Sequence, residues 1–327
     1  MQIQAIILEK KGDAKNLKNS IISLQAPKKN EVQIRHSAIG INFLDVCFRR
    51  GQYKISKYPA TLGMQACGYI EALGSEVKDF KVGDRVAYAT GGIGAYCQKR
   101  NIHQHHLIAI KHKISDEQVA AVLHNGMLVH ALLHRVYIAK RAKRALIHSA
   151  AGSVGHILCQ WAKYLGIDVI ATVGDDSKID FVKSLGVDKV INYRKNNFVD
   201  EVARLTQDKG VGIVYDGVGK DTLSQSIDCL WPMGICVNYG DSSGEAKDFN
   251  VDQLFYNSVF LTKPLMALYK SNRVELTLSA NEVLTAVEKS IIKPKITTYD
   301  FNNIVKAHMD LESRKTTGSL ILIPPKS

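Results

Sequence analysis

The stretch from Ala145 to Gly166 carries the strongest chemical signal in the sequence. An apolar run that ends at Ser149 is followed by a turn of small residues and then by an amphipathic helical pattern. Such a turn lets backbone N–H groups approach a pyrophosphate, and a helix N-terminus adds unpaired donors and partial positive charge. The spacing departs from G-x-G-x-x-G because Ala150 stands where the first glycine would be. We predict a dinucleotide site whose binding residues are Ala151, Gly152, Ser153, Val154 and Gly155.

The next predicted strand, residues 168–174, should deliver the adenosine ribose. Sites for NAD usually have an acid at the end of this strand, where it binds the 2′-hydroxyl. Here the strand ends in Val173-Gly174, and Lys178 follows one helical turn later. Asp175 and Asp176 lie in between and complicate the choice of cofactor. In the alternative interpretation, Asp175 caps the following helix and Lys178 is a solvated charge.

These motifs lie in a regular alternation of strands and helices. Strands are predicted at 144–150, 168–174, 188–192 and 212–218, with helices between them, which is typical of a parallel sheet covered by helices. The first 120 or so residues are instead β-rich, with strands expected at 31–41, 66–73 and 84–89. A helix over 115–136 with Ser115 as N-cap joins the two parts. A helix over 274–290 and a strand over 318–324 end the chain. The pattern predicts an α/β enzyme with two domains.

Length and composition agree with a water-soluble enzyme. The 327 residues are 46% hydrophobic and 23% charged, enough for two cores. No apolar run reaches the roughly 20 residues of a membrane-spanning helix, and the N-terminus lacks the features of a signal peptide. We therefore expect a cytoplasmic protein. The six cysteines are scattered without a CxxC pair, so we expect them to be reduced and mostly buried.

The net charge of +12 is the one unusual bulk feature. It would suit a polyanionic partner such as nucleic acid. However, the lysines are spread along the chain, and no basic run is interleaved with aromatic residues. We favour a solvated lysine-rich surface over a nucleic-acid site.

Over nearly its full length the sequence resembles the zeta-crystallin-like quinone oxidoreductases, the zinc-independent branch of the medium-chain dehydrogenase/reductase superfamily. The stretches that carry the resemblance include IGINFLDV, GSEVKDFKVGDRVAYA, HSAAGSVG, VINYR and ESRKTTGSLILIP. The resemblance implies a GroES-like β-rich catalytic domain over 1–124, a Rossmann doubly wound NADPH-binding domain over 125–264, and a return to the catalytic domain over 265–327. It also implies an active site in the cleft and a homodimer joined through the nucleotide domains.

The same resemblance argues against a catalytic metal. Zinc-dependent relatives place a cysteine three residues before an aspartate and a Gly-His-Glu later, whereas this chain has Asn42 before Asp45, and Gly63-Met64-Gln65. Neither Asn nor Met is a usual zinc ligand. His103, His105 and His106 cluster in a loop, and we interpret them as surface residues. We predict no metal site.

The resemblance assigns Lys178 and Tyr193 to the 2′-phosphate of NADPH, beside Gly174, and adds Tyr239 and Ser242 to the cofactor site. Three positions depart from the family pattern. Quinone reductases commonly carry glycine at Ser153, threonine at Leu128 and glutamate at Gln65. These departures bear on substrate preference.

The predicted reaction is hydride transfer from NADPH to a quinone without zinc. A quinone oxygen gains negative charge as hydride arrives, so neutral donors near it would lower the barrier. Asn42 and Tyr53 are our candidates, with a turn residue and a loop aromatic as the plainer alternatives. Asp45 is expected to hold the loop around Asn42. Two other functions stay open: reduction of an enal or enone double bond at the same site, and RNA binding.

Overall fold

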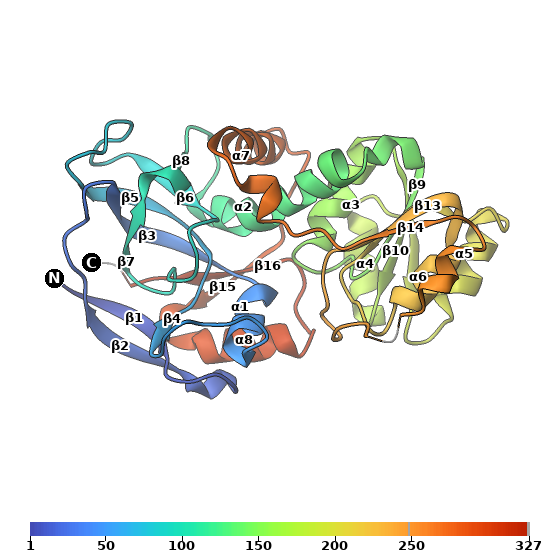
Figure 1. Ribbon diagram of the computed structural model, residues 1–327, viewed down its shortest axis with the longest axis horizontal. Coiled ribbons are helices and arrows are strands. Elements are labelled where there is room, and N and C mark those ends of the chain that lie inside the picture. The colour runs from blue at the N-terminus through green and yellow to red at the C-terminus, as the bar shows by residue number, and fades with distance from the viewer. Residues whose placement is uncertain (248, 326–327) are drawn as a thin grey trace. The chain divides into compact units, whose positions relative to one another are not determined.

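The computed structural model describes residues 1–247 and 249–325 (Figure 1). The chain forms two compact units. The first unit comprises Met1–Met127, Asn272–Lys289 and Pro294–Ser327, and the second comprises Leu128–Ser271 and Ser290–Lys293. The second unit thus starts at residue 128 rather than 125 and runs to 271 rather than 264. The domain limits drawn from the sequence stay a prediction.

The first unit is built around β3 (Glu31–Ile41). This strand pairs antiparallel with β5, β7 and β16, in a sheet of order β15-β16-β3-β5-β6-β8 with β7 also on β3. A three-stranded sheet has the order β2-β1-β4. The bounds of the other strands are β1 (Gln2–Leu8), β2 (Leu17–Ser23), β4 (Ala60–Thr61), β5 (Gln65–Leu73), β6 (Arg85–Tyr88), β7 (Lys99–His103), β8 (Ile108–Ala109), β15 (Ile296–Asp300) and β16 (Ser319–Ile323).

Three helices belong to the first unit: α1 (Phe43–Arg50), α7 (Arg273–Glu288) and α8 (Ile304–Glu312). A fourth, α2 (Asp116–Ala131), begins in the first unit and continues into the second. The predicted cap of α2 is confirmed, because Gln118 N donates to Ser115 Oγ at 3.1 Å. Apolar residues of both chain ends share one core, for example Ile6, Ile39 and Leu322.

The second unit contains a parallel six-stranded sheet of order β11-β10-β9-β12-β13-β14. The predicted α/β fold with a doubly wound parallel sheet is therefore confirmed. Short 3₁₀ turns join many of the elements. The bounds are β9 (Arg144–Ile147), α3 (Gly155–Tyr164), β10 (Asp168–Val173), α4 (Ile179–Ser184), β11 (Lys189–Asn192), α5 (Phe198–Thr206), β12 (Val211–Asp216), α6 (Leu223–Asp228), β13 (Leu230–Asn238) and β14 (Phe260–Thr262).

Several elements had not been predicted, and most predicted boundaries differ by a few residues. The sequence analysis missed, among others, α1, α6, β13 and α8. β13 is interrupted by Pro232 and by Met233, whose φ of 63° is left-handed, so its apolar pattern is broken. β9 ends at Ile147 rather than Ser149, because Ser149 has a φ of 54° and already belongs to the turn.

The cysteines have the state that we expected from their scattered positions in the sequence. All six cysteines are free, and five are buried while Cys47 is half-buried. Within residues 1–247 and 249–325, no helix combines the length and apolar character needed to cross a membrane.

A buried polar network joins the carboxyl ends of the central strands in the second unit. Asp216, at the end of β12, is fully buried and accepts hydrogen bonds from Val218 N (2.8 Å), Gly219 N (3.0 Å), and the hydroxyls of Thr222 (2.8 Å) and Ser226 (2.9 Å). Because these donors are themselves withdrawn from water, the carboxylate fixes the loop that follows β12.

The same network reaches β9 and β10 through His148. Its ring nitrogens lie 3.0 Å from Ser226 Oγ and 2.9 Å from Thr172 Oγ1. Burial lowers the pKa of His148, with Asp216 opposing that shift, so the ring is a neutral link. The network thus ties the ends of three adjacent strands to α6.

Replacing Asp216 with Ala should destabilise the second unit, because the variant leaves Val218 N, Gly219 N and the Thr222 hydroxyl without their hydrogen-bond acceptor, whereas the Ser226 hydroxyl keeps Thr222 O. We expect the free energy of unfolding to fall by at least about 3 kcal/mol. The chain's two tryptophans, Trp161 and Trp231, both lie in this unit, so their fluorescence during urea unfolding measures it directly. Asp188→Ala, which removes an exposed carboxylate, is the control and should change stability by about 0.5 kcal/mol or less. If the free energy of unfolding of Asp216→Ala also fell by only about 0.5 kcal/mol or less, this role of Asp216 would be contradicted.

Candidate active site

The predicted dinucleotide loop leads from β9 into α3. Gly152 N donates to Ser149 O at 2.9 Å, which closes the turn. A Cβ at Gly155 would lie 2.3 Å from Ser149 O and 2.7 Å from Ala150 Cα, so only glycine fits there. The first N–H groups of a helix lack intrahelical partners, and here they follow a tight turn of small residues. The residues present therefore fit a pyrophosphate at the start of α3.

The end of β10 is occupied by Gly174 and two side chains from the chain segment after β11. A Cβ at Gly174 would lie 3.4 Å from the Tyr193 hydroxyl and 3.5 Å from Arg194 Nε. The structure thus brings Gly174 and Tyr193 together, as the resemblance implied. Lys178 is the last residue of the 3₁₀ turn Asp176–Lys178 and is half-buried. Sequence reasoning missed Arg194, although a cation directly after Tyr193 was a usable signal.

The two acids beside this point have partners within the protein. Asp175 Oδ1 accepts from Ser177 N at 2.9 Å, so Asp175 caps the turn, as one of the two interpretations held. Asp176 accepts from Asn192 Nδ2 at 2.5 Å and pairs with Lys195. Hydrogen bonds from Asn192 and Lys195 hold the pKa of Asp176 below its usual range. Both carboxylates are therefore engaged in local contacts.

Tyr239 and Ser242 lie in the loop after β13, against the loop after β12. Tyr239 N donates to Asp216 O at 2.8 Å, and Ser242 N donates to Gly217 O at 3.2 Å. A Cβ at Gly217 would lie 2.7 Å from the Tyr239 hydroxyl. Both predicted residues are thus placed by the loop that Asp216 holds.

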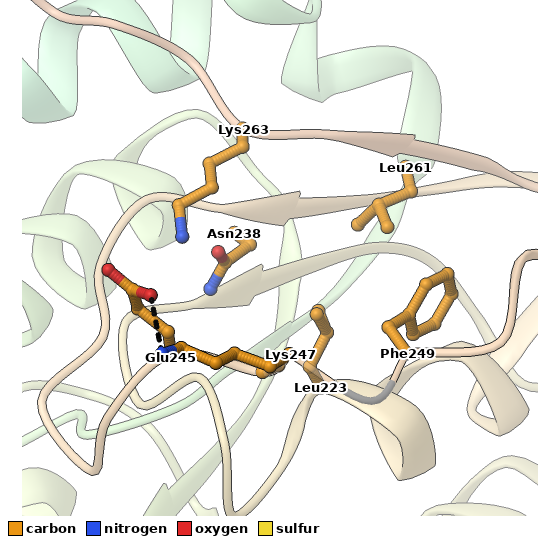
Figure 2. A pocket seen from close by; sticks show the side chains of 8 residues that line it. Leu223, Asn238, Glu245, Lys247, Phe249, Leu261 and Lys263 are labelled. Atoms are coloured by element: carbon orange, nitrogen blue, oxygen red, sulfur yellow. Dashed lines mark ion pairs between the residues drawn. The ribbon is translucent and has the colours of Figure 1, made fainter.

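A cavity of about 350 Å³ opens beside the loop after β13 (Figure 2). Its apolar side chains are Leu223, Phe249 and Leu261, and the charged ones come from Glu245, Lys247 and Lys263. Lys263 Nζ pairs with Asp241 Oδ2 at 2.7 Å, which ties the loop after β13 to the end of β14. None of the residues predicted from the sequence lines this cavity.

In the first unit, Asn42 links β3 to α1 and is 3% exposed. Asp45 Oδ2 accepts from Asn42 N at 2.8 Å and from the Tyr96 hydroxyl at 2.9 Å. Burial raises the pKa of Asp45 to about 7, while its hydrogen bonds with Asn42 and Tyr96 favour the ionised form. The contact with Asn42 is consistent with the expected holding role of Asp45.

A hydrogen-bond chain continues from Asp45 to α8. Burial and the Arg49 charge lower the pKa of His308 to about 3, so the ring is neutral. Arg49 Nε donates to His308 Nδ1 at 3.3 Å, which leaves the ring proton on Nε2, 3.2 Å from the Tyr96 oxygen. Arg49 also pairs with Glu312 at 2.5 Å. Tyr96 and His308 were not predicted, since only the fold brings them near Asp45.

The Asn42 carboxamide has one side-chain partner, beside the capping box that it forms with Asp45, and one unused donor. Asn125 Nδ2, on α2, donates to Asn42 Oδ1 at 3.0 Å. Asn42 Nδ2 is buried, and no described residue accepts a hydrogen bond from it. A buried donor without an acceptor is costly unless a ligand supplies one. Asn125, which sequence reasoning missed, is the side chain that leaves this donor available.

Tyr53 lies in a different environment from Asn42. It is 51% exposed, and its ring lies 5.4 Å from that of Phe48, centroid to centroid. The structure therefore places one predicted donor in a buried polar cluster and the other on the surface of the unit.

The remaining departures from the family pattern have structural positions. Gln65 Oε1 accepts from His124 N at 2.8 Å and so ties β5 to α2. Leu128 is buried in α2, and Ser153 is half-buried in the dinucleotide loop. In the histidine cluster, His103 and His105 are exposed and His106 Nδ1 lies 3.0 Å from Thr90 Oγ1.

Two family models match the chain. The model described as "Alcohol dehydrogenase GroES-like domain" matches residues 28–133, and the model described as "Zinc-binding dehydrogenase" matches residues 153–279. In the part of the chain that the structure describes, no three His, Cys, Asp or Glu residues form a group that could hold a metal ion.

The chain is similar to known proteins over nearly its whole length. Quinone oxidoreductase 1 of Escherichia coli is 40% identical over 302 residues, 91% of this chain and 92% of that protein. The 2-haloacrylate reductase of Burkholderia sp is 35% identical over 330 residues, 98% and 99% of the two chains. The structure of Escherichia coli quinone oxidoreductase complexed with NADPH has a TM-score of 0.94 at 38% identity, covering 98% of this chain and 100% of that one. The chain therefore belongs to the quinone oxidoreductase family of the medium-chain dehydrogenase/reductase superfamily.

Proposed function

We propose that the protein is a zinc-independent NADPH:quinone oxidoreductase. The observation that carries the proposal is Asn42, whose Nδ2 group is buried and has no acceptor among the described residues. A neutral donor of this kind suits an oxygen that becomes negatively charged in the transition state. The similarity to quinone oxidoreductases over more than nine-tenths of the chain supports a quinone as electron acceptor.

NADPH, when bound, supplies the hydride from its nicotinamide ring, and the protein binds and orients it. We assign its pyrophosphate to Ala151, Gly152, Ser153, Val154 and Gly155 at the start of α3. We assign the 2′-phosphate to Gly174, Lys178 and Tyr193, and further cofactor contacts to Tyr239 and Ser242. The NADPH complex of the Escherichia coli relative supports this choice of cofactor.

On the electron acceptor, the protein's part is to bind the oxygen that gains charge. Asn42 donates from its side chain, and Asp45 fixes the Asn42 backbone. Tyr53 is a second donor at the surface, and its 51% exposure makes its contribution the smaller one because water competes for it.

The homodimer through the nucleotide-binding unit and the cytoplasmic location stay predictions. We propose β14 as the dimer contact because it is the last strand in its sheet's order. Phe255, Tyr256 and Phe260 are exposed on or just before it. An unpaired strand edge with exposed aromatic side chains is a feature that a partner sheet covers.

Reduction of an activated carbon–carbon double bond is the second candidate, favoured by the 35% identity to a 2-haloacrylate reductase. Turnover of a benzoquinone, an enone and 2-chloroacrylate with NADPH separates the two functions. We expect the quinone to have the highest kcat/KM, with unchanged activity after chelation because the described side chains form no metal-binding group. A preference for the enone or the haloacrylate would assign the second function, and loss of activity that only zinc restores would disprove zinc independence.

The 2′-phosphate assignment predicts a preference for NADPH over NADH. Lys178→Ala should weaken NADPH binding by roughly ten- to a hundredfold, since a hydrogen bond to a charged group contributes about 1.5 to 3 kcal/mol. NADH lacks the phosphate and should bind with unchanged Kd. Lys183→Ala removes an exposed lysine of α4 and is the matched control. Equal losses for both cofactors, or a wild type that prefers NADH, would contradict the assignment.

If Asn42 binds the developing oxyanion, Asn42→Ala should lower kcat while the Kd of NADPH stays the same. The loss should be about a hundredfold where the donor is shielded from water. Tyr53→Phe should lose much less, and Tyr164→Phe, at another exposed tyrosine, should lose nothing. Turnover of Asn42→Ala equal to that of the wild type would show that this donor takes no part in the reaction.

A further inference from the structure

We propose that Asn125 determines which side of the Asn42 carboxamide is offered to the electron acceptor, and that it keeps the N–H₂ side available. Asn125 is thus a positioning residue, and this inference rests on the proposed function of Asn42 as a donor.

A carboxamide has a donor on one side and a hydrogen-bond acceptor on the other. Rotation by half a turn about χ2 exchanges them, and this torsion has broad, two-fold preferences. A site for a developing oxyanion needs the donor, because the carbonyl oxygen in the same place would repel negative charge. The orientation must therefore be set by the surroundings of the side chain.

Asn125 is the side chain that sets it, in addition to the capping box that Asn42 forms with Asp45. Its Nδ2 group, which can only donate, lies 3.0 Å from Asn42 Oδ1. With Asn42 reversed, two N–H₂ groups would face each other in a buried place, since Asn42 and Asn125 are 3% and 4% exposed. Loss of this buried hydrogen bond disfavours the reversed orientation by roughly tenfold to a hundredfold.

Asn125 is itself held in place by its two neighbours on α2. His124 N donates to Gln65 Oε1 at 2.8 Å, which fixes this turn of α2 against β5. On the other side, a Cβ at Gly126 would lie 2.5 Å from Val283 Cγ1, so glycine lets α2 pack closely on α7. A hydrogen bond to a β-strand and a close helix contact therefore fix the backbone of α2 at Asn125.

The Asn42 backbone is fixed independently. Asp45 accepts from Asn42 N at 2.8 Å and does not depend on Asn125 for that contact. Replacing Asn125 should therefore change the orientation of the Asn42 side chain and leave its backbone in place. This separation makes the inference testable by substitution.

The decisive variant is Asn125→Asp. An ionised carboxylate only accepts hydrogen bonds, so it attracts Asn42 Nδ2 and turns Asn42 Oδ1 toward the electron acceptor. A protonated carboxyl can donate and so keeps the original orientation. The ratio of variant to wild-type kcat should therefore fall tenfold or more as pH rises through the pKa of the new carboxyl. Taking the ratio removes the pH dependence that the two enzymes share. Asn125→Leu, which removes the donor without reversing Asn42, should lose less and show no such pH dependence.

Binding supplies a readout that does not depend on turnover. Pentafluorophenolate carries a negative oxygen, and its methyl ether, pentafluoroanisole, has the same ring without the charge. In calorimetry with NADP⁺ present, Asn125→Asp at high pH should bind the phenolate at least tenfold more weakly, with the ether unchanged.

Double substitution separates the inference from the function it rests on. In the Asn42→Ala background, Asn125→Asp should have no further effect, because no carboxamide remains to be turned. An equal loss in both backgrounds, or a pH-independent ratio near one, would overturn the inference while leaving the role of Asn42 intact. Unchanged kcat in Asn42→Ala alone would instead refute the proposed function.

Discussion

The pairing of β16 with the end of β3 is the constraint on which the first unit depends. Leu320 pairs with Ile41 and Ile321 pairs with Gly40, so the last strand of the chain lies beside the two residues before Asn42. On its other side, Gly40 pairs with Gln65 of β5. The strand that delivers Asn42 is therefore held from both sides, once by the chain end and once by a residue that also anchors α2. A β-ladder of this kind fixes the register of a strand, because a shift by one residue would point every side chain to the opposite face of the sheet.

Each unit also uses one buried carboxylate to hold the loop that follows a strand, but the two differ in kind. Asp216 accepts from two backbone N–H groups and two hydroxyls, a set of donors that suits an ionised carboxylate. Asp45 accepts fewer hydrogen bonds, and burial raises its pKa to about 7. Its stabilising contacts therefore operate close to the pH at which the group changes charge. A raised pKa means that the folded state favours the protonated acid, so the contribution of Asp45 to stability falls as pH rises from its ordinary pKa of 3.8 to about 7 and stays constant above that.

Much of the fold could be read from the sequence where hydrophobic periodicity is strong. β3 at 31–41 has the bounds that its pattern predicts. The failures have local causes: α6 has only six residues, too few to show a helical period, and β13 contains a proline and a left-handed Met233. Short or interrupted elements depend on tertiary packing rather than on propensity, so the sequence alone carries little signal for them.

The candidate site residues also divide into those that local sequence indicates and those that only the tertiary structure brings together. A residue in a contiguous motif, such as Gly155 after β9, can be identified from the sequence because the local turn leaves no room for a Cβ. Asn125 and His308 could not, since each acts on Asn42 or Asp45 from a distant part of the chain. Burial also separated two residues that the sequence treated alike, because Asn42 is 3% exposed and Tyr53 is 51% exposed. Residue type and spacing therefore identify candidate hydrogen-bond donors. The tertiary structure decides which of them is withdrawn from water and can form a strong hydrogen bond.

The charges near the proposed 2′-phosphate site show how tertiary structure can also change the effect expected of a residue. By count alone, Asp175 and Asp176 argue against a phosphate next to Gly174. In the structure, Asp175 caps its own turn, and the charge of Asp176 is compensated by Lys195, with Asn192 as a further donor. What then remains at the end of β10 is the Tyr193 hydroxyl and the Arg194 guanidinium. A dianion responds to the charges that are left uncompensated around it, and that balance is set by hydrogen bonds that a charge count cannot represent.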